Sequence, residues 1–243
     1  SIMRYLCEIS YDGYLFYGFQ RQKDKRTVCS LVEEVLSKVL NENILIVGAS
    51  RTDRGVHANS FYFHFDCEKV LDTEKLKTSL NKLISNDIYF KNITIVNEDF
   101  HARYSVKSKE YVYVINMGEY NPTRRNYELE YNKKINIKLL KKASKYLVGE
   151  HDFKSFTSDS MGKNTVRRIN YIKFKKNKEL LIISIEANGF LKYMIRNIIG
   201  LFLEINENKK TPIMTKEILE SKDRTKLGIK APSSGLYLNK IKY

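Results

Sequence analysis

The sequence has little of what disulfide-stabilised and metal-binding proteins require. It contains three cysteines, Cys7, Cys29 and Cys67, and no Cys-x-x-Cys pair. Cysteines so far apart support neither a disulfide framework nor a thiolate metal site. The four histidines, at positions 57, 64, 101 and 151, also lack metal-ligand spacing. We therefore expect a reduced, cytoplasmic protein without a metal ion, in which the histidines are structural or contact a ligand.

Long apolar runs and glycine-rich loops are also absent. No apolar stretch reaches the roughly 20 residues that a membrane span needs. The opening residues, Ser1-Ile2-Met3-Arg4, begin a strand-like segment and lack the apolar core of a signal peptide. Neither a phosphate-binding loop nor a dinucleotide fingerprint occurs. We expect no membrane segment and no nucleotide cofactor.

Acidic residues are scarce relative to basic ones. The chain has 43 Lys and Arg against 28 Asp and Glu, which gives a net charge of +15. Such an excess favours a polyanionic partner, most simply nucleic acid. Lysine-rich codon usage in an A/T-rich genome is the alternative. That alternative explains the lysines better than it explains the four arginines that lie within motifs, Arg51, Arg54, Arg103 and Arg196.

The hydrophobic pattern predicts an α+β fold. In the first half, strands are expected at 4–11, 60–66 and 88–96, with helices after Thr27 and from Asp72, the second with Leu76, Leu80 and Leu83 inward. In the second half we expect a strand at 110–115, a helix at 136–147, a hairpin of 171–174 and 180–187, a helix at 190–205 and a strand at 236–241. Strands with single helices between them favour antiparallel sheets. A polar stretch near 104–109 divides the chain into domains 1–106 and 107–243.

One short motif combines a carboxylate with positive charge. It reads Arg51-Thr52-Asp53-Arg54-Gly55-Val56-His57-Ala58, after an apolar run at 44–47 that predicts a short strand. The flanking arginines favour an ionised Asp53, and Gly55 permits a tight turn. An ionised carboxylate in such a place can act as a nucleophile or a base. An ordinary surface ion pair is the alternative interpretation.

This motif resembles the signature of the tRNA pseudouridine synthase A family, in which the aspartate is catalytic. Further blocks with the family's pattern follow in order along the chain: Tyr11-Asp12-Gly13 with Phe16, Gly18, Phe19 and Gln20; Phe100-His101-Ala102-Arg103; Lys109-Glu110-Tyr111-Val112-Tyr113; Gly149-Glu150-His151-Asp152-Phe153; Thr165-Val166-Arg167-Arg168; Asn188-Gly189-Phe190-Leu191; Met194-Ile195-Arg196-Asn197; Ala231-Pro232; and Gly235-Leu236-Tyr237-Leu238. Because the blocks are many and ordered, chance is a poor explanation.

The resemblance implies a fold and an activity. The fold would be two α/β domains with mainly antiparallel sheets, joined around a central, positively charged RNA-binding cleft. The activity would be cofactor-independent conversion of uridine to pseudouridine at positions 38, 39 and 40 of the tRNA anticodon stem-loop, by a homodimer. Two alternatives stay open: a paralogue that modifies another tRNA or rRNA uridine, and a non-catalytic RNA-binding protein on the same scaffold.

The resemblance also implies roles for single residues. Asp53 would be the catalytic carboxylate, acting at C1′, at C6 or on the 2′ proton. Arg51 would hold a phosphate or fill the space left by the flipped base, unless it only pairs with Asp53. Arg196 follows apolar residues on a predicted helix, where an unpaired charge is costly, and the family pattern makes Asp53 its partner.

The resemblance implies that four further residues bind the substrate. Tyr111 would stack on the uracil, unless it only packs on a strand face, as we expect of Tyr113. Leu236 would form an apolar wall of the pocket, unless it belongs to the core. Arg54 and Arg103 are expected to contact the RNA.

Overall fold

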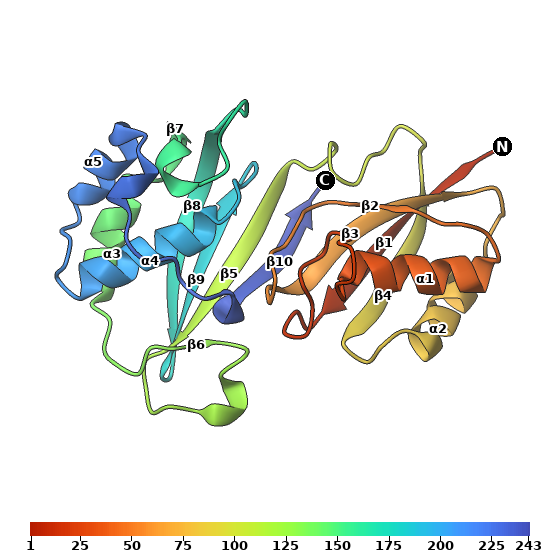
Figure 1. Cartoon of the computed structure of the whole chain (residues 1–243), viewed down its shortest axis with the longest axis horizontal. Coiled ribbons are helices and arrows are strands. Elements are labelled where there is room, and N and C mark those ends of the chain that lie inside the picture. The colour runs from red at the N-terminus through yellow and green to blue at the C-terminus, as the bar shows by residue number, and fades with distance from the viewer. The chain divides into compact units, whose positions relative to one another are not determined.

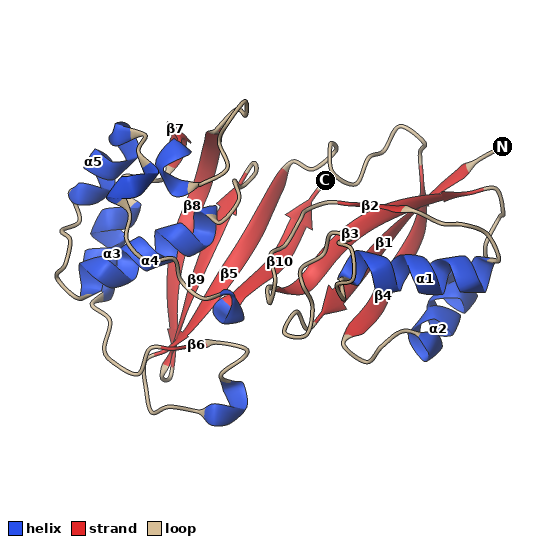
Figure 2. Cartoon of the chain, viewed as in Figure 1, coloured by secondary structure: helices blue, strands red, loops and turns tan.

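The chain folds into two compact units, each with a set of neighbouring strands and with helices on one face of them (Figures 1 and 2). The computed structural model describes residues 1–243. Unit 1 comprises Ser1–Lys107 and Tyr237–Tyr243, and unit 2 comprises Ser108–Leu236. The α+β class with mainly antiparallel strands, expected from the sequence, is confirmed.

Unit 1 is built on four neighbouring strands in the order β4-β1-β3-β10. Its elements are β1 (Met3–Tyr11), α1 (Val28–Leu40), β2 (Ile46–Gly48), β3 (His57–Cys67), α2 (Thr73–Leu83), β4 (Ile88–Val96) and most of β10 (Leu236–Lys242). Strands β1, β2, β3 and β4 pair antiparallel, whereas β10 runs parallel to β3. Residues 237–243 of this last strand group with unit 1, whereas the division predicted from the sequence places them in the second domain.

The core of unit 1 follows from alternation on the strands and from capping of the helices. Tyr5, Cys7 and Ile9 alternate along β1 and are fully buried. The Thr27 side chain accepts a hydrogen bond from the backbone N–H of Ser30, which starts α1 where the sequence predicts it. The inward position predicted for Leu83 is wrong, because this last residue of α2 is 53% exposed.

Unit 2 has the strand order β5-β9-β8-β7, all antiparallel, with β6 beside β5. Its elements are β5 (Ser108–Asn116), β6 (Leu129–Glu130), α3 (Ile137–Ser144), β7 (Gly149–Asp152), β8 (Val166–Asn177), β9 (Leu180–Ala187), α4 (Met194–Asn206) and α5 (Met214–Ser221), with short 3-10 turns between some of them. The predicted hairpin of β8 and β9 is confirmed. The strand β7 and the helix α5 were not predicted.

Two helix bounds in unit 2 differ from the sequence-based expectation. The helix expected from residue 190 begins at Met194, because Tyr193 has a left-handed backbone with φ of 64° that a right-handed helix does not accept. The helix expected to reach residue 147 ends at Ser144. None of the chain's helices combines the length and the apolar character that crossing a membrane would require.

Candidate active site

Residues 51–56, called here the Asp53 loop, connect β2 to β3 in unit 1. The backbone N–H of Val56 donates to the carbonyl oxygen of Asp53 at 3.1 Å. Gly55 has a φ of 82°, a conformation that glycine adopts without a steric cost. The turn leaves Asp53 half-buried and Arg51 and Arg54 exposed. A tight turn after a short strand therefore presents the carboxylate, as the sequence predicts.

The segment of residues 11–19 holds the Asp53 loop by hydrogen bonds. The backbone N–H of Phe19 donates to the carbonyl of Thr52 at 3.2 Å, and that of Gly55 donates to the carbonyl of Phe16 at 3.2 Å. The hydroxyls of Tyr11 and Thr52 share a buried hydrogen bond of 2.7 Å. These bonds reach the loop on both sides of Asp53, so its position is set by tertiary contacts as well as by the turn itself.

Close backbone approach between these two segments requires glycine. A Cβ atom on Gly13 would lie 1.9 Å from the carbonyl oxygen of Val56. A Cβ on Gly18, whose φ is 81°, would lie 2.6 Å from the carbonyl oxygen of Thr52. The Gly13 N–H donates to Nδ1 of buried His57 at 2.9 Å. The Tyr-Asp-Gly and Gly-Phe-Gln blocks of the sequence thus serve to hold the motif that carries Asp53.

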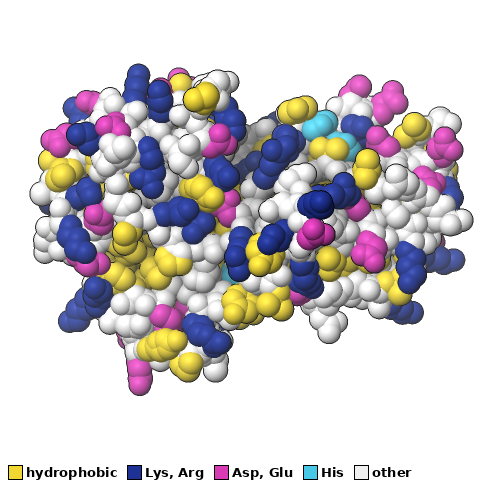
Figure 3. Space-filling view, viewed as in Figure 1, with side chains coloured by type: hydrophobic (Ala, Val, Ile, Leu, Met, Phe, Trp, Pro, Cys, Tyr) yellow, Lys and Arg dark blue, Asp and Glu magenta, His cyan; other side chains and the backbone are white.

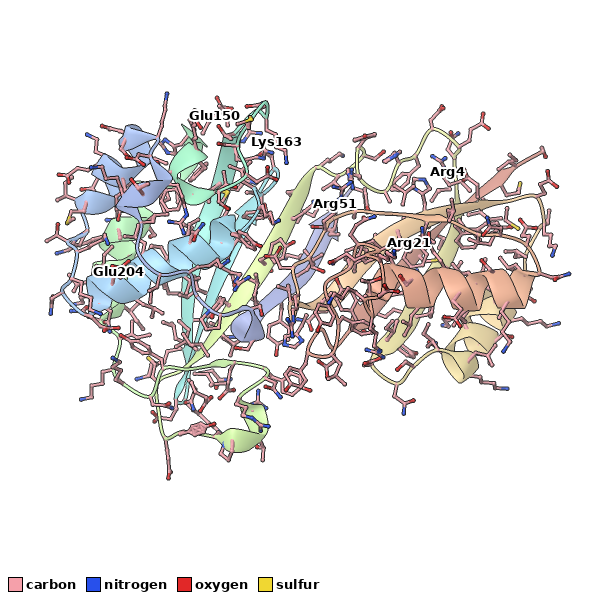
Figure 4. The ribbon with its side chains drawn as sticks, viewed as in Figure 1. Arg4, Arg21, Arg51, Glu150, Lys163 and Glu204 are labelled. Carbon is pink, nitrogen blue, oxygen red and sulfur yellow. The ribbon has the colours of Figure 1, made fainter.

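Two cations lie beside the loop over the ring of Tyr17, a contact that the sequence does not predict. The Arg54 guanidinium lies 4.2 Å from the centre of the Tyr17 ring, and Lys25 lies 4.7 Å from the same centre. Such geometry is attractive because the ring face is electron-rich. Arg51 extends from the loop (Figure 4) and is exposed. The role of Arg51 stays a prediction.

Arg103 lies in a different part of unit 1, in the loop of residues 97–107. Its backbone N–H donates to Nδ1 of His101 at 3.1 Å, and its side chain is half-buried. Nearby, burial lowers the pKa of His64 to about 4, with Arg4 and His101 adding to the effect. His64 and His101 each accept a hydrogen bond from a backbone N–H of this loop, so both are structural here. The RNA contact expected of Arg103 stays a prediction.

Tyr111 and Tyr113 lie on β5 of unit 2 and differ in their surroundings. Tyr111 is 7% exposed and meets Phe190 edge to face, with ring centres 5.2 Å apart. Tyr113 is fully buried, and its hydroxyl donates to the carbonyl of Pro232 at 2.7 Å. Burial also raises the pKa of Tyr113. The packing role expected for Tyr113 agrees with this burial, whereas stacking of Tyr111 on a base stays a prediction.

Arg196 lies in the first turn of α4 and is tied to the segment around Ala231. Its Nε donates to the Ala231 carbonyl at 2.8 Å, and the Ala231 N–H donates to the Arg196 carbonyl at 3.0 Å. The guanidinium lies 5.5 Å from the centre of the Tyr193 ring, over which Lys230 sits at 3.6 Å. The Met-Ile-Arg-Asn and Ala-Pro blocks therefore meet in unit 2. The carboxylate partner expected of Arg196 stays a prediction.

Leu236 is 4% exposed and follows Gly235, whose Cβ would lie 2.7 Å from the carbonyl oxygen of Val114. This close approach packs the final strand's first residue against β5. The sequence leaves Leu236 as either a core residue or a wall of the pocket, and its burial agrees with both.

The predicted site residues belong to both units. Unit 1 carries Asp53, Arg51, Arg54 and Arg103, whereas unit 2 carries Tyr111, Arg196 and Leu236. Figure 3 shows Lys and Arg side chains on the visible surface of each unit. No three His, Cys, Asp or Glu side chains gather in a way that could hold a metal ion. The expectation of a metal-free site nevertheless stays a prediction.

Comparison with known proteins supports the resemblance. The sequence model of the tRNA pseudouridine synthase family matches residues 9–105 and 143–243, which include the Asp53 loop and Arg196 but leave Tyr111 outside. The tRNA pseudouridine synthase A of Thermoanaerobacter sp. (strain X514) is 40% identical, over 97% of each chain. Proteins with the same name from Clostridium acetobutylicum and Streptococcus agalactiae are 39% and 40% identical, over 97% and 99% of this chain and 97% and 95% of their own. This chain belongs to the tRNA pseudouridine synthase family.

Proposed function

We propose that this chain converts uridine to pseudouridine at positions 38, 39 and 40 of the tRNA anticodon stem-loop. As a member of its family it is an isomerase that acts on tRNA. The observation that carries the proposal is the Asp53 loop, which presents a half-buried carboxylate beside exposed arginines and is held by the segment of residues 11–19.

The reaction needs little beyond positioning and a carboxylate. The N1–C1′ bond of the uridine breaks, the uracil turns, C5 joins C1′, and a proton leaves C5 while N1 gains one. Atoms and electrons balance within the nucleotide, so no oxidant or energy source is consumed. The base of a helical RNA is inaccessible, and it must be turned out of its stack before any group reaches it.

Asp53 is the group we assign to the bond-breaking step. It can attack C1′, add to C6 of the uracil, or take the 2′ proton, and all three require an ionised carboxylate at a fixed place. The hydrogen bonds from residues 11–19 to both sides of the loop supply that fixed place. A preorganised group contributes to catalysis because it need not be oriented during the reaction.

The remaining roles follow the family pattern. Arg51 holds a phosphate or fills the space left by the flipped base, and Arg54 and Arg103 contact the RNA. Tyr111 stacks on the uracil, and Leu236 lines the base pocket. Arg196 is the cation that the pattern assigns to the catalytic carboxylate. We further propose that the enzyme is a cytoplasmic homodimer. A non-catalytic RNA-binding role is disfavoured, since such a protein has no need of Asp53, Tyr111 and Arg196 together.

The test is to map pseudouridine in unmodified tRNA transcripts after incubation with the purified protein. One transcript carries uridine at 38, 39 and 40, and its matched control carries cytidine there. The proposal expects pseudouridine at these positions in the first transcript and none elsewhere in either. Product only at another tRNA or rRNA uridine would support the paralogue, and absence of product with tight tRNA binding would support the non-catalytic alternative.

A further inference from the structure

The loop of residues 97–107 in unit 1 carries a stack of three rings. His64, His101 and Tyr104 form it, and we call it the Tyr104 stack. The rings of His64 and His101 meet edge to face with centres 4.9 Å apart. The rings of His101 and Tyr104 lie nearly parallel, with centres 4.1 Å apart and planes at 19°. Tyr104 ends the stack.

The inner rings are fixed by hydrogen bonds to the backbone. Nδ1 of His64 accepts from the N–H of Ala102 at 3.0 Å. Nδ1 of His101 accepts from the N–H groups of Arg103 and Tyr104, both at 3.1 Å. Burial lowers the pKa of both histidines, that of His64 to about 4. Near neutral pH the inner rings are therefore uncharged and held in place.

The outer ring is open to solvent. Tyr104 is 77% exposed even though one of its faces lies on His101. Because one face of the Tyr104 ring lies on His101, its other face is available to a stacking partner. Figure 3 shows histidine side chains reaching the surface of unit 1 among hydrophobic and basic side chains.

The loop of the stack carries charges of both signs. Arg103 and exposed Lys107 lie in it, as do exposed Glu98 and Asp99. Arg4 projects from β1 (Figure 4) and is held by Asp66 at 2.8 Å and by the carbonyl of Phe100 at 2.7 Å. A rigid aromatic face beside cations is the arrangement by which proteins take up unpaired bases, because every base has a stacking face and a phosphate accompanies it.

We propose that the exposed face of Tyr104 is a stacking platform for an unpaired nucleobase of the RNA substrate, separate from the residues that carry out the reaction. This inference rests on the proposed function, since it takes RNA as the substrate. The platform contributes to RNA binding and leaves the chemical step unchanged.

A single tryptophan provides a direct test. The chain contains no Trp, so Tyr104→Trp introduces the only one. A short oligouridylate should quench its fluorescence with a saturable concentration dependence, and an abasic oligonucleotide of the same length and charge should not. Tyr120→Trp is the matched control, since Tyr120 is an exposed tyrosine of unit 2. Equal quenching of both variants, or none of Tyr104→Trp, would overturn the proposal.

Kinetics on a tRNA transcript provide the second test. Loss of one stacked base corresponds to about a 5- to 150-fold change in binding. Tyr104→Leu should raise KM within that range at unchanged kcat, while Tyr104→Phe and Tyr120→Leu stay within about twofold of the unmodified protein. A lower kcat at unchanged KM in Tyr104→Leu would contradict a binding role. If the unmodified protein makes no pseudouridine, the proposed function fails, whereas the oligouridylate titration still decides the platform.

Discussion

The backbone N–H of Gly13 donates a hydrogen bond to Nδ1 of His57, 2.9 Å away. This bond joins the segment that follows β1 to the residue with which β3 begins, just after the Asp53 loop. The loop is therefore fixed at its end by a side chain as well as along its length by backbone hydrogen bonds. Disturbing the contact should move the carboxylate without removing any group that takes part in the reaction.

Gly13→Ala should lower turnover strongly. The added Cβ would lie 1.9 Å from the carbonyl oxygen of Val56, so the loop must shift. A misplacement of about 1 Å can cost on the order of 10²-fold in rate. Two quantities are measured: the single-turnover rate, which should fall, and the tRNA affinity, which should change little. Gly162→Ala is the control: a Cβ there meets nothing within 4 Å, so its left-handed φ of 69° costs stability without shifting the Asp53 loop. Unchanged turnover in Gly13→Ala would show that the loop does not need this fit.

Stability should fall in mild acid because of His64. Its pKa is about 4 in the folded protein, below the ordinary value of 6.5. Between these values the unfolded chain binds a proton that the native protein does not, so the free energy of unfolding rises with pH. The stabilisation is complete above about pH 6.5 and declines as pH falls toward 4.

Urea unfolding at several pH values between 4 and 7 tests this assignment. His64→Asn keeps an acceptor for the Ala102 N–H but does not titrate, so its free energy of unfolding should depend less on pH across the window. Some dependence should remain, because the pKa of His101 is lowered too. Equal slopes for the two proteins would contradict the assignment.

RNA binding should weaken steeply with salt. Each neutralised phosphate contributes about −0.9 to the slope of log K against log salt on a duplex and about −0.7 on single strands. Replacing exposed Arg54 by Gln should reduce the slope by about 1, whereas Lys216→Gln on α5 should not. Fluorescence titrations with tRNA at several salt concentrations measure this slope. A slope shallower than about −2 for the unmodified protein would favour genome composition as the origin of the charge.

The sequence predicts elements well where a local signal coincides with a periodic pattern. The bounds of β4 match, and α1 begins after Thr27 because that residue both precedes the apolar pattern and caps the helix. The start of α4 was missed because the left-handed backbone of Tyr193 leaves no mark on hydrophobic periodicity. Leu83 was placed inward by spacing, although the end of a helix can project beyond its neighbours.

The sequence suggests the chemistry of the candidate site but not the contacts that hold it in place. The carboxylate and the arginines stand within one motif, so their types and order suffice to suggest a role. The Arg54 contact with Tyr17 and the Gly13 bond to His57 join segments that are distant in sequence. Such contacts depend on the tertiary fold, which periodicity does not specify. The stacked rings of His101 and Tyr104 lie only three residues apart, but the loop conformation that brings them together is not specified by hydrophobic periodicity either.

Tyr111 separates chemistry from packing. If its ring stacks on uracil and its hydroxyl helps to move a proton, Tyr111→Phe should bind tRNA well and turn over slowly, and Tyr111→Leu should lose base capture as well. Tyr113→Phe is the matched control: it should keep its activity and lose about 1 kcal/mol of stability with its hydrogen bond to Pro232. Single-turnover rates, tRNA affinities and thermal midpoints of these variants distinguish the two roles. Full turnover in both Tyr111 variants would remove this residue from the active site.

The central claim is that Asp53 carries out the reaction, and Asp53→Asn tests it most directly. The substitution keeps the size of the side chain and removes its charge, so folding and tRNA affinity should stay near normal. Asp24→Asn, at an exposed turn of the same unit, is the matched control and should remain active. The measurement is the single-turnover rate of pseudouridine formation at saturating enzyme. We expect a loss of at least ~10⁴-fold, about 5.5 kcal/mol of barrier, whereas a rate above about a tenth of that of the unmodified protein would contradict the assignment.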